Sequence, residues 1–331
     1  MTPLISFIIP AYNIPEPLLL RSVDSIRTLS LSTHERQIII VDDGSDSPVS
    51  NLWADDPTVV LLRQANAGLS AARNAALAIA SATYVQLLDA DDQLIGTYYD
   101  RCISILRQEQ PDILKFDYTD DQSPAKQAIH HETFESGAHF MIHNNLQPGA
   151  CAYIFRRSTA DGLTFTEGIY HEDEEFTPLL FLRAGKTIIT NAPAYFYDSR
   201  PGSITQYVDP DKLRKRLADF YGVILRLKNH LLTLKKENGK SLSVRALQRR
   251  IDQAAMDYII NVMRLNRQAY PNLTPLARYK HLHQALNTAI IQMQADQLFP
   301  LPPASYTSNY SRFRRIANSS LLRKILCIKK L

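Results

Sequence analysis

The first 200 residues alternate short apolar runs with helical stretches, and this alternation constrains the fold more than any other feature of the sequence. Runs that predict strands lie at Leu4–Ile9, Gln37–Val41, Val59–Leu62 and Tyr84–Leu88. Apolar residues recur with a helical period at Pro17–Leu29, Gly68–Ala80 and Thr97–Gln108. Strands that alternate with helices form a mainly parallel sheet, because each parallel crossover has room for a helix. We therefore expect an α/β fold with a mixed, mainly parallel sheet covered by helices.

The pattern changes near residue 205. Long helical stretches follow, separated by breaks rich in Gly, Pro and Asn, at Asp211–Lys236, Ser243–Asn266, Thr274–Gln297 and Tyr310–Lys330. Residues 1–204 carry 14 Lys and Arg against 26 Asp and Glu, a net charge of −12, whereas residues 205–331 carry 23 against 7, a net charge of +16. We expect a sheet domain over residues 1–205 and a basic α-helical extension over residues 206–331. Its partner is an anionic membrane, nucleic acid or the acidic half of the chain itself.

Composition excludes several classes of protein. A chain of 331 residues that is 45% hydrophobic and 21% charged can bury a sizeable core, which excludes disorder over most of its length. Cys102, Cys151 and Cys327 are far apart and odd in number, so they fit neither a disulfide framework nor a zinc motif. We find no signal peptide and no run of about 18 apolar residues that predicts a spanning helix. A cytoplasmic protein is expected.

Three carboxylates follow the predicted strand Tyr84–Leu88, namely Asp89, Asp91 and Asp92. Ligands of open α/β sheets bind beyond the carboxyl ends of the strands. Clustered carboxylates at such an edge suit a hard divalent cation that binds together with a phosphorylated substrate. The structural alternative is a solvated acidic turn or a helix cap, and Asp92 in particular suits a cap.

Polar residues also follow the first two predicted strands. Pro10 and Tyr12 come directly after Leu4–Ile9, and Asp42 and Asp43 end the second strand. An aromatic ring stacks on a planar base and a carboxylate accepts its N–H, so Tyr12 with Asp42 or Asp43 suits a uracil-like base. The alternative is an ordinary turn, for which the Asp-Gly pair is common.

Two further clusters lie at predicted helix starts. Asn66 and Gly68 lead into a helix that carries Arg73 in its early turns. A helix N-terminus beside an Arg suits an anion, although a surface Arg on a core-packing helix is the equal alternative. Further along, four acids crowd the helix start at Glu172–Glu175. Such crowding raises the pKa of at least one of them, as expected near a catalytic base, and His171 beside them suits a hydrogen-bonding partner.

Together these motifs resemble family 2 of the glycosyltransferases, which have the Rossmann-like GT-A fold. The resemblance covers about Leu4–Thr205 and rests on five motifs in the family's order. They are Phe7–Asn13, Val41–Ser45, Asn66–Asn74, Leu88–Asp92 and Glu172–Asp173. The run Tyr195–Ile204 also resembles the segment that closes the catalytic domain in bacterial members that build surface polysaccharides.

The resemblance implies an inverting enzyme that moves a hexose or an N-acetylhexosamine from a nucleotide sugar, preferably a UDP-sugar, to a hydroxyl of a saccharide or lipid-linked acceptor. It implies a donor site made of Pro10, Tyr12, Asp42, Asp43, Asn66, Gly68, Arg73, Asp89, Ala90 and Asp91. Asp91 would be the direct ligand of a Mn or Mg ion, with Asp89 beside it. The cation would offset the charge that grows as the nucleotide departs.

The same resemblance implies that Asp173 is the general base, which takes the proton of the acceptor hydroxyl as it attacks. Glu172 would orient this base. Asp92, His171 and Arg200 are further candidates for contacts in the site, with Arg200 suited to a phosphate or to the acceptor.

The end of the chain lies outside the resemblance. Residues 310–330 contain seven basic residues and no acid, and one face of a helical wheel is apolar, with Phe313, Ala317, Leu321, Ile325 and Ile328. A basic amphipathic helix is typical of proteins that dock on anionic membranes. Docking on the inner face of the plasma membrane would suit a lipid-linked acceptor. The alternative is a helix that packs on the acidic domain of its own chain.

Two other functions fit parts of the sequence. A sugar nucleotidyltransferase shares the layered fold and the need for a metal, but it needs a Gly-rich phosphate loop after the first strand, and Pro10–Asn13 contains no glycine. A non-catalytic protein could use the basic half to bind a membrane or nucleic acid. Only the net charge supports binding to nucleic acid, because the sequence has no recognisable nucleic-acid-binding motif.

Overall fold

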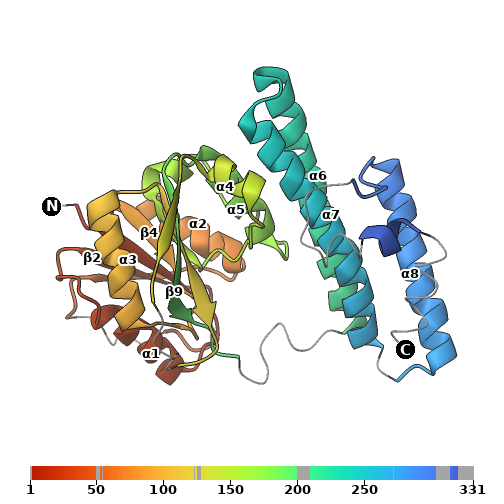
Figure 1. Ribbon diagram of the computed structural model, residues 1–331. Helices are drawn as coiled ribbons and strands as arrows, with labels where there is room; N and C mark the ends of the chain where they lie inside the picture. The colour runs from red at the N-terminus through yellow and green to blue at the C-terminus, as the bar shows by residue number, and fades with distance from the viewer. Residues whose placement is uncertain are drawn as a thin grey trace. The chain divides into compact units, whose positions relative to one another are not determined.

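The computed structural model describes residues 2–49, 53, 55–122, 124, 128–199, 209–270, 272–302 and 314–319. The chain forms two compact units, Met1–Arg200 and Pro201–Leu331 (Figure 1). The first unit contains the sheet and the second is helical.

A nine-stranded sheet forms the centre of the first unit, in the order β3-β2-β1-β4-β8-β6-β9-β5, with β7 paired to β9. The strands are β1 (Ile5–Ala11), β2 (Arg36–Asp42), β3 (Val59–Arg63), β4 (Tyr84–Leu87), β5 (Gln93–Leu94), β6 (Ile113–Thr119), β7 (His131–Phe134), β8 (Tyr153–Arg156) and β9 (Thr187–Phe196). Strands β3, β2, β1 and β4 are parallel, and β8 runs antiparallel to both β4 and β6. The expected α/β fold with a mixed sheet is confirmed.

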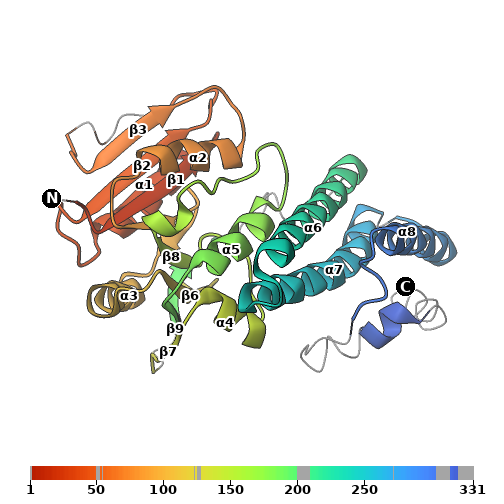
Figure 2. The same cartoon turned by 90° about the horizontal axis from the view of Figure 1, so that it is seen from above.

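Helices cover both faces of this sheet (Figures 1 and 2). They are α1 (Glu16–Arg27), α2 (Leu69–Ile79), α3 (Gly96–Glu109), α4 (Gly137–His143) and α5 (Glu172–Arg183). Helices α1 and α3 share one apolar core with the odd-numbered residues of β1. Helix α2 packs against β1 and β2, and the small side chains of Ala72 and Ala76 on its buried face allow a close approach. The packing of α2 places its N-terminus at the carboxyl ends of these strands.

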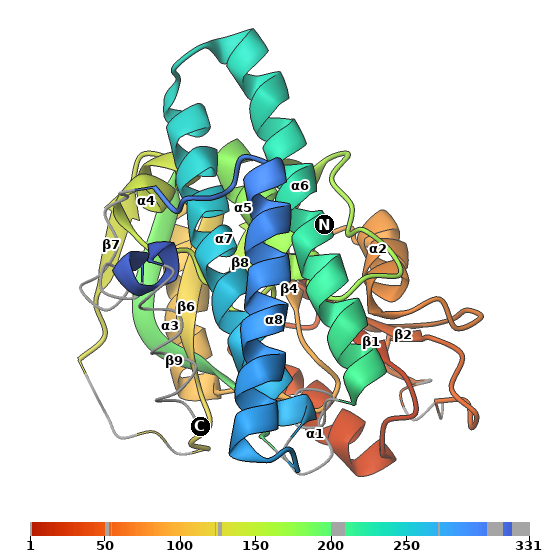
Figure 3. The same cartoon turned by 90° about the vertical axis from the view of Figure 1, so that its right-hand side faces the viewer.

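The second unit consists of α6 (Pro210–Asn238), α7 (Leu242–Ala269) and α8 (Pro275–Ala295), followed by a short helix over residues 314–318. Each long helix begins where a side chain accepts backbone N–H groups, namely at Asp209, Ser241 and Thr274. The helices pack in sequence, α6 on α7 and α7 on α8 (Figure 3). The described residues after 208 contain no strand, as the sequence predicts.

The described part of the C-terminal segment packs on its own unit. Ala317 is 1% exposed, and the side-chain amide of Asn318 both donates to the carbonyl and accepts from the N–H of Leu301. Ala317 therefore faces protein, whereas the amphipathic-helix interpretation assigns it to a membrane-binding face. The rest of 310–330 lies outside the described residues. Nowhere in the described parts of the chain is a helix both long and apolar enough to span a bilayer.

Candidate functional site

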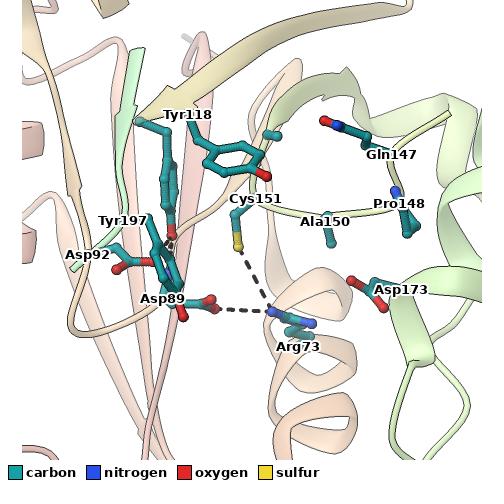
Figure 4. Close-up of a pocket in the computed structure, with 13 residues that line it drawn as sticks. Arg73, Asp89, Asp92, Tyr118, Gln147, Pro148, Ala150, Cys151, Asp173 and Tyr197 are labelled. Carbon is teal, nitrogen blue, oxygen red and sulfur yellow. Dashed lines mark hydrogen bonds and ion pairs between the residues drawn. The ribbon is translucent and has the colours of Figure 1, made fainter. Parts of the chain in front are cut away.

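A cleft of about 460 Å³ opens at the carboxyl end of β4 (Figure 4). Four of the predicted site residues line it, namely Arg73, Asp89, Asp92 and Asp173. They come from α2, from the turn after β4 and from the start of α5, which are far apart in the sequence. Six other predicted residues do not line this cleft: Pro10, Tyr12, Asp42 and Asp43 lie at the neighbouring ends of β1 and β2, and Asn66 and Gly68 lie in the loop before α2.

Arg73 connects the two acidic motifs. It is 3% exposed, and its guanidinium group donates to Glu172 Oε1 at 2.7 Å and to Asp89 Oδ1 at 3.1 Å. Burial opposes the charged form, but the negative charges of Asp89, Glu172 and Asp173 outweigh it and raise the pKa of Arg73. Arg73 is therefore a permanent cation between the carboxylates, and its hydrogen bonds are made within the protein.

Asn74, next to Arg73, connects the same helix to the segment before α5. Its side chain accepts from the N–H of Phe165 at 2.8 Å and donates to the carbonyl of Phe165 at 2.9 Å and to Glu167. Two consecutive residues of α2 thus hold the chain on either side of the α5 N-terminus. This explains how Asp173, about a hundred residues further along the chain than Arg73, reaches the same cleft.

Asp92 is buried in the structure and does not form a helix cap. Its carboxylate accepts from the Tyr195 hydroxyl at 2.6 Å and from the N–H of Asp198 at 2.9 Å. Tyr195 also accepts from the N–H of Asp89 at 3.2 Å, so one phenol fixes both ends of the acidic turn. Burial raises the pKa of Asp92 to about 7, with further contributions from the charges of Asp89 and Asp91.

The acidic turn suits a hard cation, since it offers only carboxylate oxygens. The Asp89 side chain is 38% exposed and faces the cleft, while Asp91 is half-buried and Ala90 is buried. A bound cation would offset the repulsion among the neighbouring carboxylates of this turn. Among the described residues, however, no three His, Cys, Asp or Glu side chains are already grouped as a metal site.

Helix α5 begins with the acidic motif. Asp173 lines the cleft, and its Oδ1 accepts from the N–H of Glu174 at 2.9 Å. All four acids fall in the first turn, where the helix dipole stabilises negative charge. His171 precedes the helix with a φ of +66°, and its carbonyl accepts from the N–H of Glu174. His171 does not line the cleft, and Arg200 lies outside the described residues.

The predicted base-binding residues divide into one exposed side chain and two buried ones. Tyr12 is 54% exposed at the end of β1, so its ring is open to a ligand. Asp42 is buried and accepts from the N–H groups of Ser45 and Val49 and from Arg63. Burial alone would raise the pKa of Asp42, but these hydrogen bonds and the charge of Arg63 lower it. Asp42 thereby holds the loop after β2 in place.

Asp43 holds the loop before α2 in the same way. Its carboxylate accepts from the N–H groups of Ala67 and Gly68, at 3.0 and 2.8 Å, and from the Gln64 side chain. The Asn66 side chain in turn donates to the carbonyl of Asp43. Gly68 has a φ of +91°, which favours glycine. These contacts bring the second and third motifs together at one edge of the sheet.

The comparison with known families agrees with this geometry. Residues 6–160 match the family model described as glycosyl transferase family 2. The N-terminal unit belongs to glycosyltransferase family 2. The match covers β1 to β8, and with them the turn that carries Asp89 and the helix that carries Arg73.

Sequence relatives carry glycosyltransferase names. The chain is 27% identical over 247 residues to "Uncharacterized glycosyltransferase EpsJ" of Bacillus subtilis, and this covers 70% of the chain and 71% of EpsJ. It is 27% identical over 227 residues to "Glycosyltransferase GlyA" of Streptococcus pneumoniae, which covers 61% of the chain but 31% of GlyA. The chain therefore spans most of one relative and less than a third of the other.

Two solved structures show the same GT-A fold. S. aureus TarS in complex with UDP-GlcNAc aligns with a TM-score of 0.55 at 20% identity, over 89% of this chain and 92% of that one. The mannosyltransferase PcManGT of Pyrobaculum calidifontis, in complex with GDP-Man and Mn²⁺, aligns with a TM-score of 0.54 at 12% identity, over 99% of this chain and 86% of that one. At these identities the likeness concerns the fold.

Part of the cleft in this family 2 domain was not predicted. Its remaining wall includes Tyr118, Gln147, Ala150, Cys151, Tyr195 and Tyr197. These residues lie at the ends of β6 and β9 and in the loop before β8. The sequence signal for Tyr195 and Tyr197 was the run Tyr195–Ile204, which the resemblance includes without assigning roles. The loop before β8 carries no charged residue and gave no such signal.

Proposed function

We propose that this family 2 glycosyltransferase transfers a sugar from a nucleoside diphosphate sugar to a hydroxyl of a saccharide or lipid-linked acceptor, with inversion at the anomeric carbon. The observation that carries the proposal is the placement of Asp89 and Asp173 in one cleft, with Arg73 between them. Donor phosphates belong at the Asp89 side and the attacking hydroxyl at the Asp173 side, so the two reacting groups would meet in the cleft.

The donor base belongs at the ends of β1 and β2. Tyr12 offers an exposed ring on which a base can stack, and Asp42 and Asp43 fix the loops around it through hydrogen bonds within the chain. A uracil base is our preferred candidate. It is supported by the motifs in the sequence and by the fold shared with TarS, whose structure contains UDP-GlcNAc.

A Mn or Mg ion would be held by Asp91 and Asp89 together with the donor diphosphate. When bound, it would neutralise charge on the departing nucleotide. The acidic turn fits such an ion because its ligands are oxygens and because Asp92 behind them is itself fixed by Tyr195. The structure of PcManGT with GDP-Man and Mn²⁺ shows that this fold accommodates such a pair.

Asp173 would act as the general base. It would accept the proton of the acceptor hydroxyl through a carboxylate oxygen while that hydroxyl attacks the anomeric carbon from the face opposite the leaving nucleotide. The ion pair of Glu172 with Arg73 would position the first turn of α5, and with it Asp173, without contact to the substrate. The family match favours this reaction over a sugar nucleotidyltransferase or a non-catalytic protein that binds a membrane or nucleic acid.

A thermal-shift screen against UDP-, GDP-, CMP- and dTDP-sugars, each with Mn, Mg or a chelator, tests the donor and cation. We expect stabilisation by one nucleotide class that is lost with the chelator, because a ligand that binds only the folded state raises its stability. Asp173→Asn should keep this donor binding and abolish transfer, whereas Asp91→Ala should weaken metal-dependent donor binding. Normal turnover by the Asp173 variant would contradict the assignment of the base.

A further inference from the structure

Tyr118 is an exposed aromatic residue in the wall of the cleft (Figure 4). It is 56% exposed, and its side chain makes no ring contact and no hydrogen bond with any described residue. Tyr195, its partner across the sheet, differs in both respects, because it is buried and its hydroxyl donates to Asp92 at 2.6 Å. An aromatic side chain that is left open within a cleft offers both its face and its hydroxyl to a ligand.

The sheet itself fixes the position of Tyr118. The pairing of β6 with β9 changes register on both sides of Asp117, directly before Tyr118. Phe116, on the other side of this irregularity, is buried in the core that α1 and α3 share with the sheet. The pairing then resumes, and the N–H of Tyr197 donates to the carbonyl of Thr119 at 2.8 Å. Irregular pairing of this kind redirects side chains beside active sites, and here it leaves the Tyr118 ring in the cleft on a backbone that strand pairing holds.

Gln147 lies across the opening of the cleft from Tyr118 (Figure 4). Its side chain is exposed, and the amide makes no hydrogen bond with any described residue. The chain that carries it is fixed, because Thr177 on α5 donates to the carbonyl of Pro148 at 2.6 Å. Gly149 follows, and a Cβ added there would meet nothing within 4 Å. The cleft therefore has open space between an aromatic ring and an amide that are both unpartnered within the described chain.

The charges that line the cleft disfavour an acidic acceptor. Among the described residues of the lining, the one basic side chain is Arg73, whose Nη atoms donate within the protein to Glu172 and Asp89. A phosphate beside the reacting hydroxyl would approach carboxylates with no cation of the protein left to balance it. The carboxylates of the lining are those of Asp89, Asp92 and Asp173. An uncharged acceptor fits this cleft better.

We propose that the acceptor is a neutral pyranoside, a sugar ring that carries no phosphate, and that it binds with one face of its ring on Tyr118. The inference rests on the proposed function and names its acceptor class. One face of a pyranose presents C–H groups, which pack on an aromatic ring, while the hydroxyls at its edge suit an amide such as that of Gln147. A ring held in this way directs an edge hydroxyl into the cleft, where Asp173 would take its proton. The enzyme would therefore extend a saccharide, and it would not add the first sugar to a polyol phosphate or a lipid phosphate.

Saturation-transfer difference NMR on the entire chain, with UDP and Mg present, tests this acceptor class directly. The probes are the methyl β-glycosides of glucose, galactose and N-acetylglucosamine, the 1-phosphates of the same three sugars, and ribitol 5-phosphate. We expect at least one methyl glycoside to bind, with the strongest transfer to the C–H protons of one ring face. The matching 1-phosphate should bind more weakly. Ribitol 5-phosphate, which has hydroxyls and a phosphate but no ring, should give no signal.

Two substitutions at Tyr118 connect this binding to the ring. Tyr118→Ala removes the ring and should raise the Kd of the glycoside roughly 10-fold, the cost of truncating an aromatic side chain at the centre of a binding site. Tyr118→Phe keeps the ring and should keep the affinity. Gln147→Ala should also weaken binding, because a hydrogen bond to a hydroxyl is lost. Each variant should keep the thermal shift that UDP produces, which shows that the fold and the donor site are intact.

The possible outcomes separate the acceptor from the donor. Absence of transfer to every methyl glycoside, an unchanged Kd in the Ala variant, or tighter binding of the phosphates would overturn the inference and leave the proposed function standing. Failure of the unmodified protein to bind any nucleotide sugar would instead contradict the proposed function.

Discussion

Arg73 is the residue on which the geometry of the cleft depends most directly. Its two Nη atoms hold acids from the fourth and fifth motifs, so a change at this single position loosens both. A lysine has one ammonium group and cannot form both contacts with the same geometry. Arg73 is therefore a positioning residue, and the effects of its loss on turnover and on stability are separable.

We expect Arg73→Lys to keep the fold and to lower kcat roughly 100-fold, because a small misplacement of Asp173 is costly for the reaction. Arg73→Met leaves the largely buried Glu172 and the partly exposed Asp89 without their cation, and it should lower the free energy of unfolding by about 3 kcal/mol, the lower end of the range for a buried pair. Steady-state kinetics and urea denaturation measure the two effects. Arg107→Lys, in an exposed pair with Glu35, is the control and should change little. A Lys variant with normal kcat would show that Arg73 is merely structural.

Gly44, in the second motif, has a backbone conformation and a close contact that favour glycine. Its φ is +75°, and an added Cβ would lie 2.6 Å from the backbone nitrogen of Asn66. Gly44→Ala should therefore lower the free energy of unfolding by about 2 kcal/mol or more and weaken donor binding, because the loops after β2 and before α2 must separate. Gly96→Ala, which meets nothing within 4 Å, is the matched control for denaturation. Equal stability of the two variants would refute the close-packing argument.

The motif residues could be predicted because each follows a strand or begins a helix, where local sequence carries the signal. What Asp42 and Asp43 do could not be predicted. One of the two, Asp42 or Asp43, is expected from the sequence to accept from a base, and the structure shows that both carboxylates also accept from backbone N–H groups of neighbouring loops. Cys151, just before β8, reaches the cleft only through the pairing of β8 with β4 across the sheet. Such nonlocal pairing leaves no local sequence signal.

At the scale of elements, the parallel half of the sheet follows from the alternation of strands and helices, and the mixed half does not. Strand β8 lies between β4 and β6, which precede it in the chain, and runs antiparallel to both. The β6–β9 pairing also changes register between Lys115 and Tyr118. Strands β5 and β7 have two and four residues, too few for a periodic pattern to be recognised.

Helix α7 contains an acid that should make the helical unit sensitive to pH. Burial raises the pKa of Asp252 to about 6, although Gln248 donates to its carboxylate and Lys235 lies nearby. A carboxyl with a raised folded-state pKa binds its proton more tightly when folded. Its stabilising contribution is therefore present below the ordinary value of 3.8 and is lost as the pH rises through about 6.

Asp252→Asn removes this titration. We expect the variant to be more stable than the unmodified protein at pH 8, on the order of 2 kcal/mol, and the difference to disappear near pH 4. Amide hydrogen exchange of peptides from α6 and α7, compared between the two proteins at each pH, measures local stability. A difference that is the same at every pH would mean that Asp252 keeps its ordinary pKa.

At the scale of the whole molecule, the chain combines an acidic family 2 domain with a basic helical unit. The sequence shows the charge difference between the two units, but it does not identify the binding partner of the basic unit. The docked position of Ala317 and Asn318 favours packing on the same unit for residues 314–319. We therefore predict that contact with an anionic membrane is made by the basic residues that follow in the sequence.

The packed residues 314–319 and the basic residues after them can be tested separately by substitution. Replacing Arg323, Lys324, Lys329 and Lys330 with Gln leaves the packed residues 314–319 intact and removes four positive charges. At about 1 kcal/mol per basic residue, binding to vesicles that contain phosphatidylglycerol should fall roughly 1000-fold, while binding to pure phosphatidylcholine stays low. Vesicle sedimentation at two salt concentrations measures this loss, and donor hydrolysis should be kept because the cleft lies in the other unit.

The control must remove the same charge from another place, since any loss of four cations weakens attraction to an anionic surface. Lys235, Lys236, Lys240 and Arg245 are exposed around the turn between α6 and α7 and provide this match. If the terminal residues form a docking segment, the control variant binds the vesicles nearly as well as the unmodified protein. Equal losses from both variants would mean that net charge alone attracts the protein, and unchanged binding in both would favour the packed helix.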